Sequence, residues 1–230
     1  MIQCLFWHLV ERKPTKKLLK MIVRPIQNFE TESWILNKHY AKRMPSISFA
    51  FGLYDEDILV GVCTFGYPPN YNYNEGKCVF KDYKCLTLEL NRLVVNDGLP
   101  KNSLSFFVSR CLKQLPKPSC VVSYADPNNG HHGYIYQATN WIYTGVSSAK
   151  HRYIFEDGSE FDIRRGIDKK GTVVDKILLE PTHRYLYLNG NKRDLKRMMS
   201  DLKLDSLPYP KGDNTNYDAS GYVTTQGVLF

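Results

Sequence analysis

The sequence predicts an α/β protein whose core is one mixed sheet of about seven strands flanked by helices. Two observations lead to this prediction. Apolar runs with strand composition alternate along the chain with segments whose apolar residues recur at helical spacing. The clearest helical pattern, NSLSFFVSRCLKQL at 102–115, follows the long strand pattern LTLELNRLVV at 86–95, as expected where a strand leads into a helix that covers the sheet.

The elements of the first half of the chain can be assigned in order. MIVRPI at 21–26 is expected to be a strand. FETESWILNKHYAKR at 29–43 is expected to be a helix, because Asn28 can cap its start and a proline soon follows its end. The two apolar runs of 46–66 flank a short acidic turn and indicate a hairpin. Residues 67–85 are too polar and too rich in proline and asparagine for a regular element.

The second half continues the alternation after the strand and helix described above. CVVSYAD at 120–126 reads as a buried strand, and HGYIYQATN at 132–140 as a short helix. WIYTGV at 141–146 and KHRYIFE at 150–156 are expected to be two further strands.

Composition and charge indicate an ordinary globular protein. The 230 residues are 43% apolar, which suffices for one large domain, expected at 21–190 with an extension at 1–20 and a basic helix and tail at 191–230. The net charge of +8 favours a polyanionic partner. The six cysteines form no C-x-x-C pair, which favours a reducing compartment. The apolar start MIQCLFWHLV is too short to span a bilayer and lacks a cleavage signal, so we expect a cytoplasmic protein with no membrane association.

The order strand, helix, hairpin, strand, helix, strand, helix, strand, strand resembles the GNAT acyltransferase fold, in which two parallel strands splay apart around the donor. Several segments resemble, in order and spacing, the Mom family of phage DNA-modification proteins. They are HYAKRMPSISFAFGLY, LELNRLVV, VSYADPNNGHHGYIYQATNWIYTG and KHRYIF. The resemblance covers roughly residues 21–190. It implies a GNAT-like enzyme that converts adenine in double-stranded DNA to N6-carbamoylmethyladenine and protects phage DNA from restriction, in the cytoplasm of an infected or lysogenic bacterium.

The donor loop departs from the GNAT pattern. A GNAT enzyme is expected to hold the donor pyrophosphate on backbone N–H groups of a glycine-rich loop at a helix start. Here VNDGLPKNSLS at 95–105 has one glycine, and Pro100 removes an N–H donor. Asn102, Ser103, Ser105 and Arg92 remain candidate donor contacts. The alternatives are a helix cap for Ser103 and a surface ion pair for Arg92.

The product that the resemblance implies also constrains the donor. A carbamoylmethyl group, N–CH2–CO–NH2, cannot arise from acetyl transfer alone, because the acetyl group lacks a nitrogen and has its carbonyl on the other carbon. A glycyl donor supplies both carbons and the nitrogen, so glycyl-tRNA is favoured and makes tRNA a candidate partner. Acetyl-CoA is the alternative, and a metal-assisted route, with iron as the metal, stays open.

The segment around His39 is a candidate acceptor site. The resemblance places the first helix beside the incoming adenine, with His39 as a general base or metal ligand, Tyr40 as a stacking surface and Arg43 as a phosphate clamp. The alternative for His39 is a surface imidazole. A base inside a duplex must first be extruded before such residues can reach it.

The segment VSYADPNNGHHGYIY supplies the other half of the site. Asp126 ends a buried strand and is either a catalytic group or a turn cap. His39 and Asp126 are also the candidate metal ligands. Tyr136 is expected to protonate the leaving group, with Tyr134 as the alternative. The adjacent His131 and His132 are expected to be exposed loop residues.

Two basic segments are candidates for DNA binding. The first is 67–85, where aromatic and cationic residues alternate as suits unstacked nucleic acid, and the second is the late helix. The residues are Tyr71, Tyr73, Lys77, Lys81, Lys192, Arg193, Lys196 and Arg197. The alternatives are a cover loop packed on the sheet and a solvated helix face.

Three functions compete at this stage. The first is the Mom-like DNA adenine modification enzyme. The second is a GNAT N-acetyltransferase that uses acetyl-CoA on a small amine or a protein. The third is an inert DNA-binding module on a GNAT frame.

Overall fold

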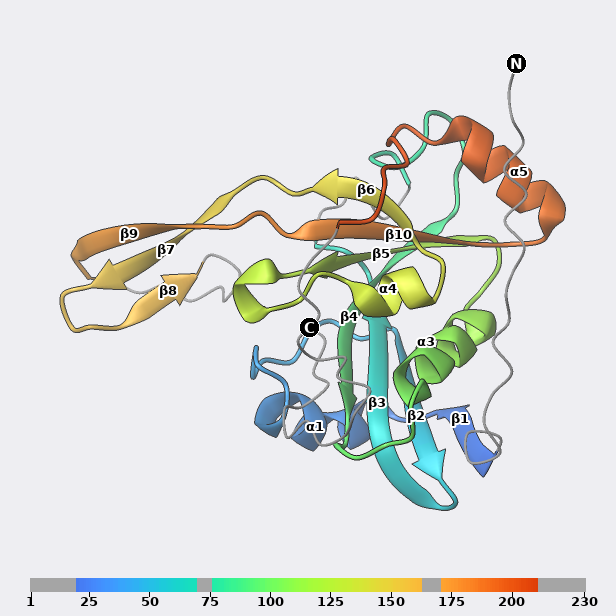
Figure 1. Ribbon diagram of the computed structural model, residues 1–230, viewed down its shortest axis with the longest axis horizontal. Helices are drawn as coiled ribbons and strands as arrows, with labels where there is room; N and C mark the ends of the chain where they lie inside the picture. The colour runs from blue at the N-terminus through green and yellow to red at the C-terminus, as the bar shows by residue number, and fades with distance from the viewer. Residues whose placement is uncertain (1–19, 70–75, 163–170, 211–230) are drawn as a thin grey trace.

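The computed structural model describes residues 20–69, 76–162 and 171–210, which form an α/β architecture around a seven-stranded sheet (Figure 1). The strand order is β1-β2-β3-β4-β5-β10-β6. The strands are β1 (Met21–Pro25), β2 (Phe49–Asp55), β3 (Ile58–Gly66), β4 (Leu86–Val95), β5 (Ser119–Ala125), β6 (Ile142–Val146) and β10 (His183–Asn189). Within this sheet β4 and β5 pair in parallel and the other neighbours are antiparallel, so the prediction of a mixed sheet of about seven strands is confirmed.

Pairing between β4 and β5 stops partway along the strands. Their parallel register runs from Leu86 only as far as Glu89, which lies opposite Val122. Beyond this point the strands diverge, and Figure 1 shows β2, β3 and β4 running in a different direction from β5, β10 and β6. Ser123 Oγ donates a hydrogen bond to the carbonyl oxygen of Leu90 at 2.8 Å, so a side chain bridges the start of the gap. The splayed parallel strands expected of a GNAT-like fold are therefore present.

Helices cover both faces of this sheet, and none within the described residues is long and apolar enough to cross a bilayer. They are α1 (Glu32–Asn37), α3 (Ser103–Gln114), α4 (Tyr134–Ala138) and α5 (Lys192–Asp201), with the 3-10 helices η2 (Asn28–Thr31) and η3 (Pro127–Asn129). The strongest helical pattern in the sequence, 102–115, corresponds to α3.

The two faces of the sheet carry separate apolar clusters. α3 and α4 pack on one face with Leu88, Phe107 and Val121. On β5 the next residue, Val122, belongs to a different cluster under α5, and because successive strand residues point to opposite faces, α5 covers the other face. α1 packs on that same side of β3 and β4 through Trp34. One face therefore has two separate covers, α1 and α5.

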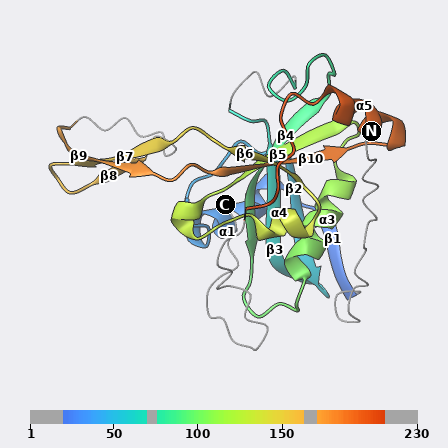
Figure 2. The same cartoon turned by 45° about the horizontal axis from the view of Figure 1, so that its top comes forward.

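A second sheet of three strands projects from the body of the molecule (Figures 1 and 2). It contains β7 (Lys150–Phe155), β8 (Glu160–Asp162) and β9 (Val173–Leu179) in the order β8-β7-β9. KHRYIFE is thus a strand, as predicted, but it lies outside the main sheet. The seventh main strand is β10, which the sequence analysis did not identify. Local periodicity indicates a strand without indicating its neighbours, so it could not show that KHRYIFE lies outside the main sheet.

The helix predicted at 29–43 is wrong in its length. η2 and α1 together end at Asn37, and the N–H groups of Lys38 and His39 both donate to the carbonyl of Trp34. Two amides that converge on one carbonyl are typical of a helix end, and Lys42 then adopts a positive φ of 42°. His39 and Tyr40 therefore lie in a turn after the helix.

We predict that Gly133→Ala destabilises the protein by about 3 kcal/mol, from left-handed backbone strain plus a forced clash. Gly133 has φ of +85°, and a Cβ added there would lie 2.3 Å from Cε2 of the Tyr185 ring. Urea denaturation measures the loss. Gly130→Ala is the matched control, since φ is +71° but nothing lies within 4 Å of its added Cβ. An equal loss in both variants would contradict the role of the Tyr185 contact.

Candidate functional site

His39 is fully buried and its two ring nitrogens differ in their surroundings. Nδ1 accepts a hydrogen bond from the backbone N–H of Ala41 at 3.0 Å. A neutral ring that accepts at Nδ1 carries its proton on Nε2. Within the described residues Nε2 has no hydrogen-bond partner. His39 therefore holds an unused donor, and the alternative of a surface imidazole is wrong.

Burial keeps His39 neutral. Loss of solvation, together with the positive charges of Arg92 and His131, lowers its pKa to about 3. An imidazole with such a pKa accepts a proton poorly at neutral pH. The ring is therefore suited to donate a hydrogen bond from Nε2 rather than to act as the general base.

Tyr40 presents an aromatic surface next to this imidazole. Its ring stacks on His39 with centroids 4.5 Å apart, and it lies 6.1 Å from the ring of His131 in a tilted arrangement. Tyr40 is 38% exposed, so one part of the ring can meet a ligand. Residues from the turn after α1 and from the loop after β5 thus meet at the rings of Tyr40 and His131.

The turn that carries His39 is fixed to β4. β4 has a bulge at Asn91, because Thr64 pairs with Arg92 and the next residue of β3 pairs with Leu90. The Asn91 side chain accepts from Thr64 Oγ1 at 2.6 Å and donates to the carbonyl of Ser46 at 2.9 Å. The bulge therefore turns a polar side chain of β4 toward the loop after His39.

Arg92 holds the same loop. Its two Nη atoms donate to the backbone carbonyls of Asn91 and Arg43, at 2.6 and 2.9 Å. The residue is only 9% exposed, so the surface ion pair considered for it is wrong. These bonds commit Arg92 to positioning the loop, and the exposed side chain of Arg43 is left to contact a ligand.

Asp126 is a structural cap in this structure. It ends β5 with 2% exposure, and its carboxylate accepts from the Asn128 N–H, Asn128 Nδ2 and Asn129 Nδ2 at 2.8 to 3.1 Å. Its negative charge also opposes the fall in the pKa of His131 that burial causes. Asp126 thus holds the loop that brings His131 to Tyr40.

His131 and His132 are not exposed loop residues, and that prediction is wrong. Both are partly buried. Burial lowers the pKa of His131, whose ring faces Tyr40, whereas His132 stands 6.1 Å from the ring of His183. The two adjacent histidines therefore lie in different surroundings, and only His131 lies against the candidate site.

Tyr136 lies at the gap between the splayed strands. Its hydroxyl is 2.8 Å from Ser123 Oγ, and because Ser123 donates onward to Leu90, the Tyr136 O–H is the donor between the two hydroxyls. Complete burial raises the pKa of Tyr136 well above its usual value, so it stays protonated. Tyr134 points elsewhere, with its ring 6.4 Å from that of His132.

Glu89 is a residue that the sequence analysis missed. Burial raises its pKa to about 7, against the opposing effect of Arg92 and Lys150. Its charge in turn raises the pKa of Tyr136. A signal was present in the sequence, since Glu89 is the one charged residue in the first half of the otherwise apolar pattern LTLELNRLVV.

The proposed metal ligands do not fit a metal. Within the described residues no group of three or more His, Cys, Asp or Glu side chains could hold an ion. His39 already uses Nδ1 for Ala41, and both carboxylate oxygens of Asp126 accept hydrogen bonds from asparagines. We therefore derive no step through iron.

The candidate donor contacts at the start of α3 are occupied locally. Ser103 is buried and its Oγ donates to the carbonyl of Pro100 at 2.6 Å. Ser105 Oγ donates to the carbonyl of Asn102 at 3.0 Å, and Asn102 has a left-handed φ of 68°. Both hydroxyls are therefore committed to backbone carbonyls at the start of α3. The helix cap considered for Ser103 is wrong, because the cap position is Asn102.

The two candidate DNA-binding segments form one surface. The Asp201 carboxylate of α5 accepts from the N–H groups of Asp82 and Tyr83, and Arg197 lies 5.4 Å over the Tyr83 ring. Phe80, counted among the aromatics of 67–85, is buried under α5. The composite basic surface consists of the exposed residues Lys77, Lys81, Lys84, Lys192, Arg193, Lys196 and Arg197. Tyr71 and Tyr73 lie outside the described residues.

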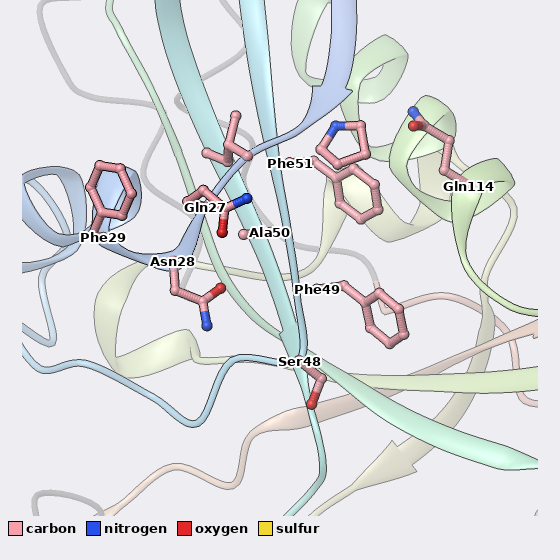
Figure 3. A pocket seen from close by; sticks show the side chains of 10 residues that line it. Gln27, Asn28, Phe29, Ser48, Phe49, Ala50, Phe51 and Gln114 are labelled. Atoms are coloured by element: carbon pink, nitrogen blue, oxygen red, sulfur yellow. The ribbon is translucent and has the colours of Figure 1, made fainter.

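A pocket of about 520 Å³ lies where η2, the start of β2 and the end of α3 meet (Figure 3). Phe29, Phe49 and Gln114 are among its lining residues. It includes none of the candidate catalytic residues, so it is a separate feature of the surface.

Comparison with known proteins assigns this chain to a family. The model of the Mom protein family matches residues 20–211. The chain is also 31% identical over 193 residues to the methylcarbamoylase mom of Escherichia phage Mu, covering 77% of this chain and 78% of that one. The chain belongs to the Mom family. The matched range contains the turn after α1, both splayed strands, α4 and α5.

Solved structures with a similar fold are acetyltransferases. Naa60 of Arabidopsis thaliana, in complex with a bisubstrate analogue, is 12% identical with a TM-score of 0.47, covering 74% of this chain and 99% of that chain. The ribosomal-protein-S5-alanine acetyltransferase of Vibrio fischeri is 11% identical with a TM-score of 0.43, covering 75% and 94%.

We predict that His39→Asn flattens the loss of stability on acidification. The pKa of His39 is lower in the folded chain than in the unfolded one, so its contribution is present above about pH 6.5 and lost as the pH falls toward 3. The effect is as much as about 5 kcal/mol. Melting temperatures between pH 7 and 4 measure it. His151→Asn, at a partly exposed position, should follow the wild type, and a parallel decline in all three proteins would refute the buried neutral state.

Proposed function

We propose that this protein is a DNA modification enzyme that converts adenine in duplex DNA to N6-carbamoylmethyladenine. The observation that carries the proposal is membership of the Mom family, whose relative from phage Mu bears the name methylcarbamoylase. The role that follows is protection of phage DNA from restriction inside the bacterial host. Double-stranded DNA is the substrate that the basic charge also favours.

The site has the parts that an extruded adenine needs. An extruded base is usually held by stacking and by hydrogen bonds to its edge. The partly exposed ring of Tyr40 offers the stacking surface. His39 carries the unused Nε2–H, which is buried in this structure and donates to a ring nitrogen of adenine once base binding uncovers it. Arg43 is exposed on the same loop and can contact a phosphate beside the extruded nucleotide.

The donor in this proposal is a glycyl ester such as glycyl-tRNA. Acyl transfer to N6 gives N–CO–CH2–NH2, which contains the same atoms as the product group N–CH2–CO–NH2. Attack of the new amine on C6 of the base, with breakage of the original C6–N bond, converts the first isomer into the second. An acetyl group from acetyl-CoA lacks the second nitrogen and would need a further nitrogen source.

Tyr136 fits the role of proton donor to the departing oxygen. It is protonated, buried and placed at the gap between β4 and β5. Asp126 acts by holding the His131 loop rather than by touching the adenine. The site therefore combines a hydrogen-bond donor, a stacking ring and a proton source.

The test is mass spectrometry of nucleosides from the DNA of bacteria that express the protein. We expect N6-carbamoylmethyldeoxyadenosine with the wild type and a loss of about 100-fold or more with His39→Ala and Tyr136→Phe, the range of a lost catalytic interaction. Duplex affinity and melting temperature of the purified variants show whether they are intact. Unmodified DNA from wild-type cells would contradict the proposed function, and acetylated protein or amine in its place would favour the acetyltransferase.

We predict that the composite basic surface contributes to DNA affinity through phosphates. Each neutralised phosphate adds about 0.9 to the magnitude of the log–log salt slope, so removing Lys192, Arg193, Lys196 and Arg197 should flatten it by up to about 3.6 units. Titrations of a duplex at several salt concentrations measure the slope. Neutralising Lys101, Arg110, Lys113 and Lys117, on and around α3, is the matched control, and an equal change in both sets would remove the special role of α5.

A further inference from the structure

Glu89 lies on β4 at the last position that pairs with β5. Its neighbours Leu88 and Leu90 point into the cluster under α3 and α4. Because side chains alternate along a strand, Glu89 points to the opposite face, where α1 and the loop after His39 lie. The carboxylate therefore lies where the gap between the splayed strands opens, on the side that carries the candidate adenine site.

Charged and titratable groups on three elements interact electrostatically with this carboxylate. The positive charges of Arg92 on β4 and Lys150 on β7 act to lower the pKa of Glu89, against the larger effect of burial. The negative charge of Glu89 in turn contributes to the raised pKa of Tyr136 on α4. The Tyr40 hydroxyl group acts to raise the pKa of Arg92 and that of Tyr136. The residue proposed to stack on adenine therefore interacts electrostatically with the same groups as Glu89.

Glu89, which is partly buried, differs from Asp126, the buried carboxylate of the site. Asp126 accepts hydrogen bonds from three amide groups. Among the described residues Glu89 takes part in long-range electrostatic interactions but accepts no hydrogen bond and forms no close ion pair. A poorly solvated carboxylate without such partners costs stability, so this position is not explained by folding. Groups of this kind are candidates for function.

We propose that Glu89 is the catalytic base that removes the proton from the attacking amino group of adenine. This inference rests on the proposed function and assigns a residue that it leaves open. As the N6 lone pair forms the bond to the carbonyl carbon of a glycyl ester, Glu89 takes the N6 proton. The C–O bond then breaks with its electron pair on the departing oxygen, which takes a proton from Tyr136. The proton on Glu89 returns to Tyr136, and both groups are restored.

His39 is the competing base, and the structure favours Glu89. His39 has a pKa of about 3 and carries its proton on Nε2, a buried atom without a hydrogen-bond partner among the described residues. Glu89 has a pKa of about 7, which is close to the value at which a general base combines a large ionised fraction with a useful proton affinity. The two residues then divide the work, with His39 orienting the adenine and Glu89 accepting its proton.

The test compares the wild type with Glu89→Gln, and Glu156→Gln at an exposed position is the matched control. Modified nucleosides are measured in DNA from expressing cells. They are also measured after incubation of the purified protein with duplex DNA in a bacterial lysate, which supplies the donor, between pH 6 and 8.5. We expect Glu89→Gln to lose about 100-fold or more of the modification, with duplex affinity unchanged and without the rise in rate that the wild type shows through about pH 7.

Melting temperature separates catalysis from a structural role. Because the pKa of Glu89 is higher in the folded chain, its stabilising contribution is present below about pH 4.5 and is lost as the pH rises through about 7. Glu89→Gln should therefore melt at or above the wild type at pH 8. Retained modification in Glu89→Gln, or a clearly lower melting temperature at pH 8, would overturn this inference. A wild type without any modified nucleoside would instead overturn the proposed function.

Discussion

Backbone pairing between β4 and β5 ends after Glu89 and Val122, and the candidate site depends on that break. A continued ladder would use the carbonyl of Leu90 and close the space between the strands. With the strands apart, the carbonyl needs another partner, because a buried acceptor without one is costly. The Ser123 hydroxyl donates to this carbonyl, and the Tyr136 hydroxyl donates in turn to the Ser123 hydroxyl oxygen. The hydrogen-bond chain that satisfies the Leu90 carbonyl thus fixes the position of Tyr136, the proton donor of the proposed reaction.

The bulge in β4 attaches the second half of the site to the same strand. Asn91 and Arg92 hold the carbonyls of Ser46 and Arg43, so the loop after His39 cannot move independently of the sheet. Glu89, the candidate base, lies only a few residues away on the same strand. β4 therefore positions the base, the loop that meets the adenine and the start of the gap, although each of these makes different contacts.

The sequence allowed the fold class to be predicted because its local patterns were strong. The apolar spacing of 102–115 became α3, and the motif segments did bring His39 and Tyr40 to the loop after β5. The burial of His39 could not be predicted, because it comes from a loop held by distant residues of β4. The place of KHRYIFE was wrong for a related reason, since β10 inserts between β5 and β6.

Other features of the site depended on contacts that no local pattern carries. The union of 76–85 with α5 rests on Asp201, which accepts two backbone N–H groups from a segment far away in the sequence. Asp126 acts as a cap because its carboxylate accepts hydrogen bonds from the two asparagines that follow it. The sequence alone left its role open between cap and catalytic group. Glu89 was visible in the sequence as a charge inside an apolar strand, but its function became arguable only once its neighbours were known.

A crystal structure of the protein with duplex DNA in which an adenine faces an abasic site tests the central claim most directly. The abasic position lowers the energy needed to extrude the adenine. The account predicts an extruded adenine against the ring of Tyr40, with a ring nitrogen near His39 Nε2 and the amino group near Glu89. An adenine that stays stacked in the duplex, or one that binds in the pocket lined by Phe29 and Phe49, would contradict it.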